Sequence, residues 1–471
     1  MKNTLTASAT AGMLLLGSCA SFSPDGGFGP VADMTRERSG QAVAWQRDAA
    51  QTQTAQARVA ELLAAPLSAD RAVEVALLNN RGLQAQFFAL GIAEADLVRA
   101  GRLANPSFSF GRLSGGGVTE IDRSIMVNLL GLLTLPAARQ VAQQRFAQAQ
   151  LQAAFDAVGL ANEVRRAFFS AVAAQDLLRY HAQVKHAAEA TSELARRMLQ
   201  AGNFNKLAQM RQQAFDADAT VQLARAQHQV LAERERLVRL LGLSGEQLRF
   251  MLPERLPDLP AEPLALQGAE QTAMHKRLDV LMAKRDTEAT AQALGLTRAT
   301  RLVNILHAGV TDKRQTGEAR QRGVEIELEL PLFDFGQARS ARAEAVYMQS
   351  VQRAADVAIT AASEVRESHA AYLTAYQLAR HYRDQIVPLK QRIADENLLR
   401  YNGMLIGVFE LLADAREQVA SVTGAIEALR EHWIAETQLQ TALTGRSPAG
   451  GLSLSPSSSS RRLDAAGDAA H

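Results

Sequence analysis

The chain has 471 residues, of which 47% are apolar and 21% are charged, and its 51 basic residues nearly balance 49 acidic ones to leave a formal net charge of +2. So small an excess argues against a nucleic-acid-binding protein, which normally carries a basic face. Aromatic residues make up only 5%, which argues against a large β-sandwich or propeller. The single cysteine excludes an internal disulfide and a cysteine-based zinc site. Length alone would suggest about three domains, and the composition is typical of long helices.

The first predicted element is an export signal. An apolar stretch over residues 5–16 follows Lys2, and the run 16–19 (Leu-Gly-Ser-Cys) ends in the only cysteine, Cys19. This run resembles the box at which bacterial lipoproteins are cleaved and lipidated, and Ala20 differs from the aspartate typical of inner-membrane retention. We therefore expect residues 1–18 to be a signal peptide and Cys19 to carry the acyl chains of an outer-membrane lipid anchor. A buried free cysteine is the alternative.

Short sequence pieces recur in the same order about 200 residues apart, as an internal duplication would leave them. The run 133–136 (Leu-Thr-Leu-Pro) recurs as 328–331 (Leu-Glu-Leu-Pro), and Arg197 recurs as Arg400. A proline-rich stretch separates the two copies. The expected organisation is a lipidated N-terminal segment 19–66, repeat 1 over 67–250, a linker over 251–268, repeat 2 over 269–445 and a disordered tail over 446–471.

Each repeat is predicted to contain one very long helix. Residues 137–201 contain no proline, and residues 337–402 contain only Pro388. Either helix would be about 100 Å long at 1.5 Å per residue, and apolar positions spaced by four and three indicate antiparallel coiled-coil packing. Shorter helices are expected at 68–103 and 270–298, and return helices at 204–241 and 405–444.

Four strand-like segments lie between the short and the long helices. They are expected at 107–112, 124–135, 302–311 and 324–330, with turns at 115–117 and 312–320. In the last strand, Glu325, Glu327 and Glu329 alternate with aliphatic residues, which places the carboxylates on one face. A small water-soluble sheet packed on helices would explain this alternation. The strands also have the length of membrane-spanning ones, and three chains together would supply the twelve strands of a closed barrel with the glutamates in its lumen.

These features resemble the TolC family of outer-membrane efflux factors over residues 67–445. The resemblance rests on 67–72 (Leu-Ser-Ala-Asp-Arg-Ala) with Asn79-Asn80 downstream, on 330–336 (Leu-Pro-Leu-Phe-Asp-Phe-Gly), on Arg400-Tyr401 with Gly403, and on Leu411-Leu412. It implies a mainly α chain with an internal duplication. The long helices would form an α-barrel, and the four strands would join those of two other copies in a 12-strand transmembrane β-barrel.

The resemblance also implies a location and partners. The protein would be a homotrimer in the outer membrane lipid of a Gram-negative bacterium, with a long periplasmic part. It would dock on a periplasmic adaptor (membrane fusion protein) and an inner-membrane pump, and so serve as the passive exit duct of a tripartite efflux or secretion system.

The periplasmic tip would be formed by the two turns between long and return helices, at 200–204 and 401–407. Glycine is expected where a helix ends and the backbone reverses, as any helical hairpin requires. The resemblance implies that these turns contact the adaptor, through Gly202, Asn203, Gly403 and Gly407.

Members of this family close the tip with side chains that follow the second turn, often with an aspartate in a Leu-Leu-Asp-Ala context. Here residues 411–415 read Leu-Leu-Ala-Asp-Ala, so Asp414 is displaced by one position, about 100° around the helix. The gate candidates are therefore Phe409, Glu410, Asp414 and Arg416. An ordinary charge pattern on a helix surface is the alternative.

Motifs for catalysis and metal binding are missing from the sequence. It contains no phosphate loop, no Gly-x-Ser-x-Gly and no His-Glu-x-x-His, and no two histidines are four residues apart. We therefore expect no enzyme activity, no catalytic residue, no metal site, no cofactor and no nucleic-acid partner. The alternative function is a periplasmic coiled-coil adaptor or scaffold without a pore, which would explain the long helices but not two strand pairs with alternating faces.

Overall fold

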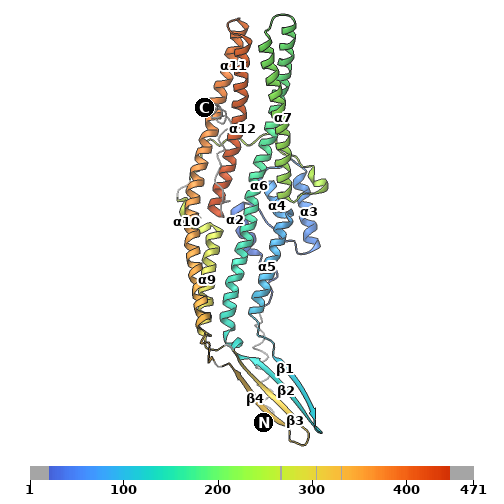
Figure 1. Cartoon of the computed structure of the whole chain (residues 1–471), viewed down its shortest axis with the longest axis vertical. Coiled ribbons are helices and arrows are strands. Elements are labelled where there is room, and N and C mark those ends of the chain that lie inside the picture. Colours follow the sequence, from blue (N-terminus) through green and yellow to red (C-terminus); the bar gives the residue numbers. More distant parts are fainter. Residues whose placement is uncertain (1–20, 266–267, 304, 330, 446–471) are drawn as a thin grey trace, which may run out of the picture. The chain divides into compact units, whose positions relative to one another are not determined.

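The computed structural model describes residues 21–265, 268–303, 305–329 and 331–445 (Figure 1). The predicted signal peptide, Cys19 and the predicted tail lie outside the described residues. The chain divides into two compact units, which are described separately. Unit 1 comprises the described residues up to Ala171 together with Leu231–Pro253 and Gln271–Ala362, and unit 2 comprises Val172–Val230, Glu254–Glu270 and the residues from Ser363 onward.

The described residues are mainly helical, as predicted. The α-helices are α2 (Gly29–Ser39), α3 (Ala49–Leu63), α4 (Ala69–Asn79), α5 (Arg81–Ala100), α6 (Leu129–Gln200), α7 (Lys206–Leu241), α8 (Ala269–Lys276), α9 (Leu278–Ala299), α10 (Gln337–His381), α11 (Val387–Asn402) and α12 (Val408–Thr444). A short 3₁₀ helix, η2 (Gly245–Leu248), and a π-helical turn, η3 (Tyr382–Ile386), complete the set. The predicted long helices and return helices are confirmed, with shifted bounds.

The long helix of repeat 1 begins earlier than predicted. Residues 129–135, expected at the end of a strand, form the first turns of α6, which contains Pro136 inside it. The reason is a cap: Asn128 Oδ1 accepts a hydrogen bond of 2.8 Å from the Gly131 backbone N–H, one of the donors that a helix start leaves unsatisfied. The run 133–136 is therefore helical, whereas Leu328, the first residue of the similar run, is the last residue of β4.

The long helix of repeat 2 is interrupted rather than continuous. The π-helical turn η3 separates α10 from α11, directly before Pro388, which has no N–H to continue the α-helical hydrogen-bond pattern. On α12, Gly424 leaves room for the Tyr382 ring, because a Cβ there would lie 2.8 Å from Tyr382 Cε1. Gly424 of α12 therefore makes room for Tyr382 of the π-helical turn.

The short helix that precedes each strand pair is broken in both repeats, at Asn80 in repeat 1 and at Arg277 in repeat 2. Asn79 Nδ2 donates to the carbonyl oxygens of Leu241 and Gly242, at 3.2 and 2.7 Å. Asn80 Nδ2 likewise donates to the Leu240 carbonyl, at 2.9 Å. The two asparagines therefore satisfy the carbonyls left open at the end of α7.

Gly242 is expected to tolerate no side chain at this contact. Its φ is +67°, and a Cβ would lie 2.8 Å from Asn79 O and 3.1 Å from Asn80 Cα. Gly242→Ala therefore adds a backbone clash to left-handed strain, and we expect it to destabilise the protein by roughly 3 kcal/mol. Gly40→Ala is the matched control, because Gly40 also has a positive φ of +75° but a Cβ there meets nothing within 4 Å. Only about 1 kcal/mol is expected for this control, and equal decreases in the thermal midpoint of the two variants would contradict the role given to the asparagine contact.

The four strands form one antiparallel sheet in the order β1-β2-β3-β4. The strands are β1 (Ser107–Gly115), β2 (Val118–Asn128), β3 (Leu306–Gln315) and β4 (Gln321–Leu328). Gly116 and Gly117, with φ of +61° and +82°, form the two-residue turn between β1 and β2. The prediction of four strands in two hairpins is confirmed, although β1 ends later than predicted, and β2, β3 and β4 both start and end at other residues than predicted. The sheet lies within unit 1, at the ends of α5, α6, α9 and α10 (Figure 1).

Residues 21–66 form a packed part of unit 1, although the sequence suggested only a lipidated segment. Phe28 lies between two other aromatic rings, with centroids 5.0 Å from Phe87 and 5.9 Å from Trp45. Helices α2 and α3 belong to the same segment. The segment therefore contributes to the hydrophobic core beside α5.

The proline-rich segment 254–264 is held against two helices of unit 2. The Trp433 Nε1–H donates to the Pro257 carbonyl at 3.0 Å, and the Tyr376 hydroxyl donates to the Ala261 carbonyl at 2.7 Å. Tyr372 accepts a hydrogen bond of 2.9 Å from the Leu264 backbone N–H. Three aromatic side chains of α10 and α12 thus fix a segment that its composition suggested was a linker.

His432 lies among these aromatic residues, and its burial makes a pH dependence of stability expected. Its side chain is fully buried, its ring centroid lies 5.5 Å from that of Tyr372 and 5.7 Å from that of Tyr376, and neither ring nitrogen has a hydrogen-bond partner among the described residues. Desolvation lowers the pKa of His432 from its ordinary value of 6.5 to about 4.

At a pH between about 4 and 6.5, His432 binds a proton in the unfolded chain but not in the folded chain. The free energy of unfolding therefore decreases as the pH falls from about 6.5 towards 4. Between pH 7.5 and 5 the expected loss is roughly 2 kcal/mol. His432→Phe keeps an aromatic ring and removes the titration, so its thermal midpoint should decrease less than that of the unsubstituted protein between pH 7.5 and 5. Parallel decreases in the two proteins would assign the pH dependence to other groups.

Candidate functional site

One face of the sheet is apolar and exposed. The strand register places Phe108, Ile125, Val310 and Val324 directly opposite one another across the four strands, and therefore on the same face. The large exposed residues of this face are Phe108, Phe110, Ile125, Val127, Val310, Val324, Ile326 and Leu328. Their exposed fractions range from 42% to 78% in the single chain. A contiguous exposed surface of this kind indicates an interaction with a membrane or another protein.

The opposite face is polar, and Glu325 and Glu327 lie on it, as the alternation predicted. Glu327 Oε2 lies 3.0 Å from His307 Nδ1 on the neighbouring strand. Glu329 lies beyond the end of β4, where its backbone N–H donates to the Ile305 carbonyl at 3.2 Å. The three predicted lumen carboxylates are therefore placed as two on the strand and one just after it.

The polar face also carries acidic residues that the sequence did not reveal. Lys313 Nζ lies 3.7 Å from Glu120 Oε1 and 3.5 Å from Asp122 Oδ2. These two carboxylates belong to β2, whose apolar and polar residues alternate less regularly than those of β4. Only the register between strands assigns them to this face.

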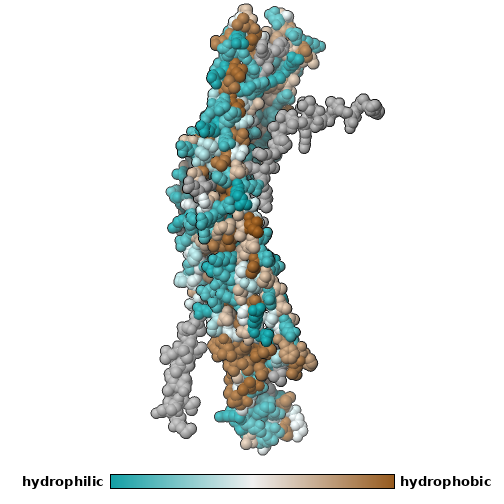
Figure 2. All heavy atoms as spheres, turned by 90° about the vertical axis from the view of Figure 1, so that its left-hand side faces the viewer, coloured by the Kyte–Doolittle hydropathy of each residue, from teal (hydrophilic) through white to brown (hydrophobic). Residues whose placement is uncertain are grey.

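Apolar residues continue from the sheet into the first turns of α6 and into the segment before α10. Leu133, Leu332, Phe333 and Phe335 are exposed, and Phe333 has an exposed fraction of 98%. In the view of Figure 2, hydrophobic atoms gather over the part of the strand region nearest the helices, whereas the end nearest the strand turns is hydrophilic. The apolar surface is thus a band with polar surface beyond it.

The first tip turn, in unit 2, joins α6 to α7. The Asn203 N–H donates to the Met198 carbonyl and the Gly202 N–H to the Leu199 carbonyl, with Gly202 at φ +75°. This is a Schellman motif with glycine at the left-handed position, as expected. Asn205, which the sequence reading did not single out, caps α7 by accepting a hydrogen bond of 2.7 Å from the Ala208 N–H.

The second tip turn, between α11 and α12, has the same hydrogen bonds but different residues. The Leu405 N–H donates to the Arg400 carbonyl and the Met404 N–H to the Tyr401 carbonyl. Here the left-handed residue is Met404, with φ of +60°, whereas Gly403 has an ordinary φ of −79°. The expectation that a glycine makes this reversal was wrong by one residue. Gly407 precedes α12 without a side-chain cap.

Two of the four gate candidates have described side chains, and they contact different helices of unit 2. Asp414 accepts a hydrogen bond from Asn397 of α11. Arg416 donates from Nη2 to the Arg211 carbonyl of α7 at 3.1 Å, and its guanidinium carbon lies 4.6 Å from the centroid of the Phe215 ring. Phe409 and Glu410 lie in the first turn of α12; their side chains are outside the described residues. Arg416 therefore connects the second helical hairpin to the first.

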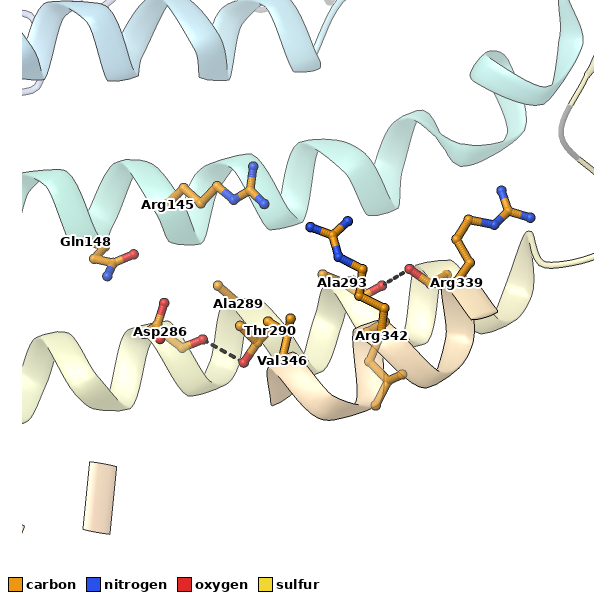
Figure 3. A pocket seen from close by; sticks show the side chains of 12 residues that line it. Arg145, Gln148, Asp286, Ala289, Thr290, Ala293, Arg339, Arg342 and Val346 are labelled. Atoms are coloured by element: carbon orange, nitrogen blue, oxygen red, sulfur yellow. Dashed lines mark hydrogen bonds between the residues drawn. The ribbon is translucent and has the colours of Figure 1, made fainter. Parts of the chain in front are cut away.

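A pocket of about 320 Å³ lies among α6, α9 and α10 within unit 1 (Figure 3). Three arginines line it, Arg145 from α6 and Arg339 and Arg342 from α10, together with one carboxylate, Asp286. Arg339 Nη2 donates to the Arg301 carbonyl at 2.9 Å. The residues lining this pocket include no histidine, cysteine or serine.

Among the described residues, no group of three or more histidine, cysteine, aspartate or glutamate side chains is arranged to hold a metal ion. In the same part of the chain, no helix combines the length and the apolar character needed to cross a membrane.

Comparison with known proteins identifies the fold. No family model and no curated protein sequence matches the chain. Solved structures do match. A membrane protein from Pseudomonas aeruginosa is 21% identical with a TM-score of 0.69, and the match covers 80% of this chain and 92% of that one. CusC, which forms a transmembrane channel, is 18% identical with a TM-score of 0.67 over the same shares of the two chains. The CmeC outer membrane channel of Campylobacter jejuni is 14% identical with a TM-score of 0.67, over 80% and 85% of the two chains. Long helices joined to a four-stranded antiparallel sheet, matched over most of its length, give this chain the fold of the TolC family of outer-membrane efflux channels.

Proposed function

We propose that the protein is an outer-membrane channel, the passive exit duct of a tripartite efflux or secretion system, and not an enzyme. The observation that carries this proposal is the four-stranded sheet with one exposed apolar face and one polar face. Its outer strands, β1 and β4, each pair on one side only. A sheet in lipid must have no unpaired edge, and three copies can close a barrel by pairing β4 of each chain with β1 of the next.

In this homotrimer the apolar face contacts lipid and the polar face lines a water-filled lumen. Glu120, Asp122, Glu325 and Glu327 bring more acidic than basic charge to that face, so the lumen favours cations. The helices extend on the periplasmic side and carry the path towards a periplasmic adaptor and an inner-membrane pump. The proposed adaptor contacts are the two tip turns, with Gly202, Asn203, Gly403 and Gly407.

Single-channel recording tests the proposed function. The full-length protein, purified as a trimer and added to a planar bilayer, should give discrete conductance steps with a preference for cations. A periplasmic adaptor or scaffold would give none. Absence of conductance from a trimer that has inserted into the bilayer would overturn the proposal.

We further propose that Cys19 carries the lipid anchor, which is supported by its position directly after the apolar stretch of the signal peptide. Cys19→Ser should abolish incorporation of a labelled fatty acid, because no other cysteine is present in the chain. The barrel would still hold the variant in the membrane. Persistent labelling of the serine variant would refute this assignment.

A further inference from the structure

Arginines form two rows across the apolar face of the sheet, next to the apolar band and on its strand-turn side. In the first row, Arg123 lies opposite Asp312, and Asp312 lies opposite Arg322. In the second row, Arg112 lies opposite Ile121, and Ile121 lies opposite Arg314. Arg320, in the turn before β4, donates from Nη2 to Asp312 Oδ2 at 2.8 Å. We call Arg112, Arg123, Arg314, Arg320 and Arg322 the arginine rows.

One carboxylate, that of Asp312, lies close to three of these five guanidinium groups. Besides its bond with Arg320, Asp312 lies 3.7 Å from Arg322 Nε and 3.9 Å from Arg314 Nε. The Asp312 side chain is only 18% exposed, whereas those of Arg314 and Arg322 are 49% and 71% exposed. The carboxylate thus lies beneath the arginines, and positive charge is what this surface presents to its surroundings.

The excess of positive charge is confined to this face. Lys313, which lies between Asp312 and Arg314 in sequence, points to the polar face and is close to two carboxylates there. The neighbouring row of the same face, on the side nearer the helices, consists of Phe108, Ile125, Val310 and Val324. On β2, β3 and β4 the apolar row is therefore followed within two residues by a row of charged residues, whereas β1 places Phe110 beside Arg123 in that row.

The cost of placing arginine on a lipid-facing barrel surface indicates the depth of these rows. That cost is large at the bilayer midplane and nearly vanishes at the level of the headgroups. The rows are on the side of the apolar band away from the helices, since they precede or follow the strand turns. If the helices are periplasmic, as the proposed function requires, the rows lie at the headgroups of the outer leaflet.

We propose that the arginine rows bind the phosphate groups of the phosphorylated glycolipid, of the lipid A type, that forms this outer leaflet. Guanidinium groups pair with phosphate oxygens through two parallel hydrogen bonds, which suits arginine better than lysine. A phosphomonoester carries more than one negative charge, so the surplus of guanidinium groups over Asp312 matches a lipid that bears more than one phosphate. This inference rests on the proposed function, because it requires that the apolar face contacts lipid.

The test compares a variant of the rows with a variant of the opposite face. The full-length trimer in detergent is titrated with bis-phosphorylated lipid A and with the same glycolipid after enzymatic removal of its phosphates, and bound lipid is counted by native mass spectrometry. Arg314→Gln with Arg322→Gln should weaken binding of the phosphorylated lipid at least tenfold. Lys313→Gln, which removes a positive charge from the same strand but the other face, should leave binding unchanged. Should the double variant fail to form trimers, the single variant Arg322→Gln, at a side chain that is 71% exposed, should still weaken binding severalfold.

Equal affinity for the phosphorylated and dephosphorylated lipids would overturn the proposal, and so would equal losses in the arginine and lysine variants. Competition by phosphatidylglycerol or inorganic phosphate at concentrations equal to that of lipid A would show a general anion surface and also overturn it. The conductance of the same unsubstituted trimer distinguishes failure of the lipid-binding proposal from failure of the proposed channel function. A conducting trimer without lipid preference refutes only the arginine rows, whereas a trimer that inserts without conducting refutes the channel.

Discussion

Replacing Val324 and Ile326 together with arginine is expected to prevent the protein from accumulating in the outer membrane. Both side chains lie on the exposed apolar face, with exposed fractions of 78% and 70%. An arginine on the lipid face of a barrel costs about 2–4 kcal/mol near the bilayer midplane, and a trimer would carry the two substitutions three times. The measurement is the amount of heat-resistant trimer in outer-membrane fractions, which should fall to a small fraction of that of the unsubstituted protein.

The matched control removes charge from the other face of the same strand. Glu325→Gln with Glu327→Gln should insert in normal amounts, because these side chains face the proposed lumen. The cation preference of this glutamine variant should be smaller than that of the unsubstituted protein, and the reversal potential across a salt gradient measures the difference. Normal accumulation of the Val324→Arg, Ile326→Arg variant would contradict a lipid-facing role for this surface.

Arg416→Ala is expected to raise the conductance of the isolated trimer severalfold. The Arg416 guanidinium connects α12 to α7 through the Arg211 carbonyl and the Phe215 ring, so its removal releases the second helical hairpin of a chain from the first. Arg416 is exposed, where a cation–ring contact contributes about 0.5–1 kcal/mol, and the hydrogen bond to the Arg211 carbonyl adds to this contribution. Single-channel recordings in the same lipid and salt give the comparison.

Lys390→Ala is the control for this experiment, because the ion pair that Lys390 forms among the described residues, with Glu417, lies within the α11–α12 hairpin. Its conductance should remain at the unsubstituted level. The proposed gate also includes acidic residues, so the double variant Glu410→Ala, Asp414→Ala should conduct more than the unsubstituted protein. If neither this variant nor Arg416→Ala changes the conductance, the gate lies elsewhere.

Local patterns predicted most of the secondary structure. The alternation of Glu325 and Glu327 with aliphatic residues identified β4 and the two faces of the sheet. The absence of proline over 137–201 identified α6, and glycines at 116 and 117 marked the turn between β1 and β2. In each case the determining property belongs to neighbouring residues, so the sequence contains it directly.

The features that the sequence did not reveal depend on contacts between distant residues. Glu120 and Asp122 belong to the polar face only through pairing with β3. The segment 254–264 looked like a linker, because nothing local indicates that aromatic side chains of α10 and α12 hold its backbone. The start of α6 depended on a single capping bond from Asn128.

The second tip turn shows a different limit. A glycine was expected at the reversal, and Gly403 stood next to the right position, but the left-handed residue is Met404. A non-glycine residue in this conformation is strained by about 1 kcal/mol, which sequence patterns do not predict. The strain occurs at one of the proposed adaptor contacts, where Met404 is 93% and Leu405 78% exposed.

Strand β4 is proposed to cross a bilayer with one face in lipid and the other in water, and alternating accessibility of its residues to a thiol reagent is the direct test. Single cysteines are introduced at 324, 325, 326 and 327 in the otherwise unchanged protein, whose only other cysteine is the proposed acylation site. The trimer is reconstituted in lipid and treated with a membrane-impermeant thiol reagent. Positions 325 and 327 should be labelled, and positions 324 and 326 should be protected. Equal labelling at all four positions would contradict this placement of β4 and favour a water-soluble sheet.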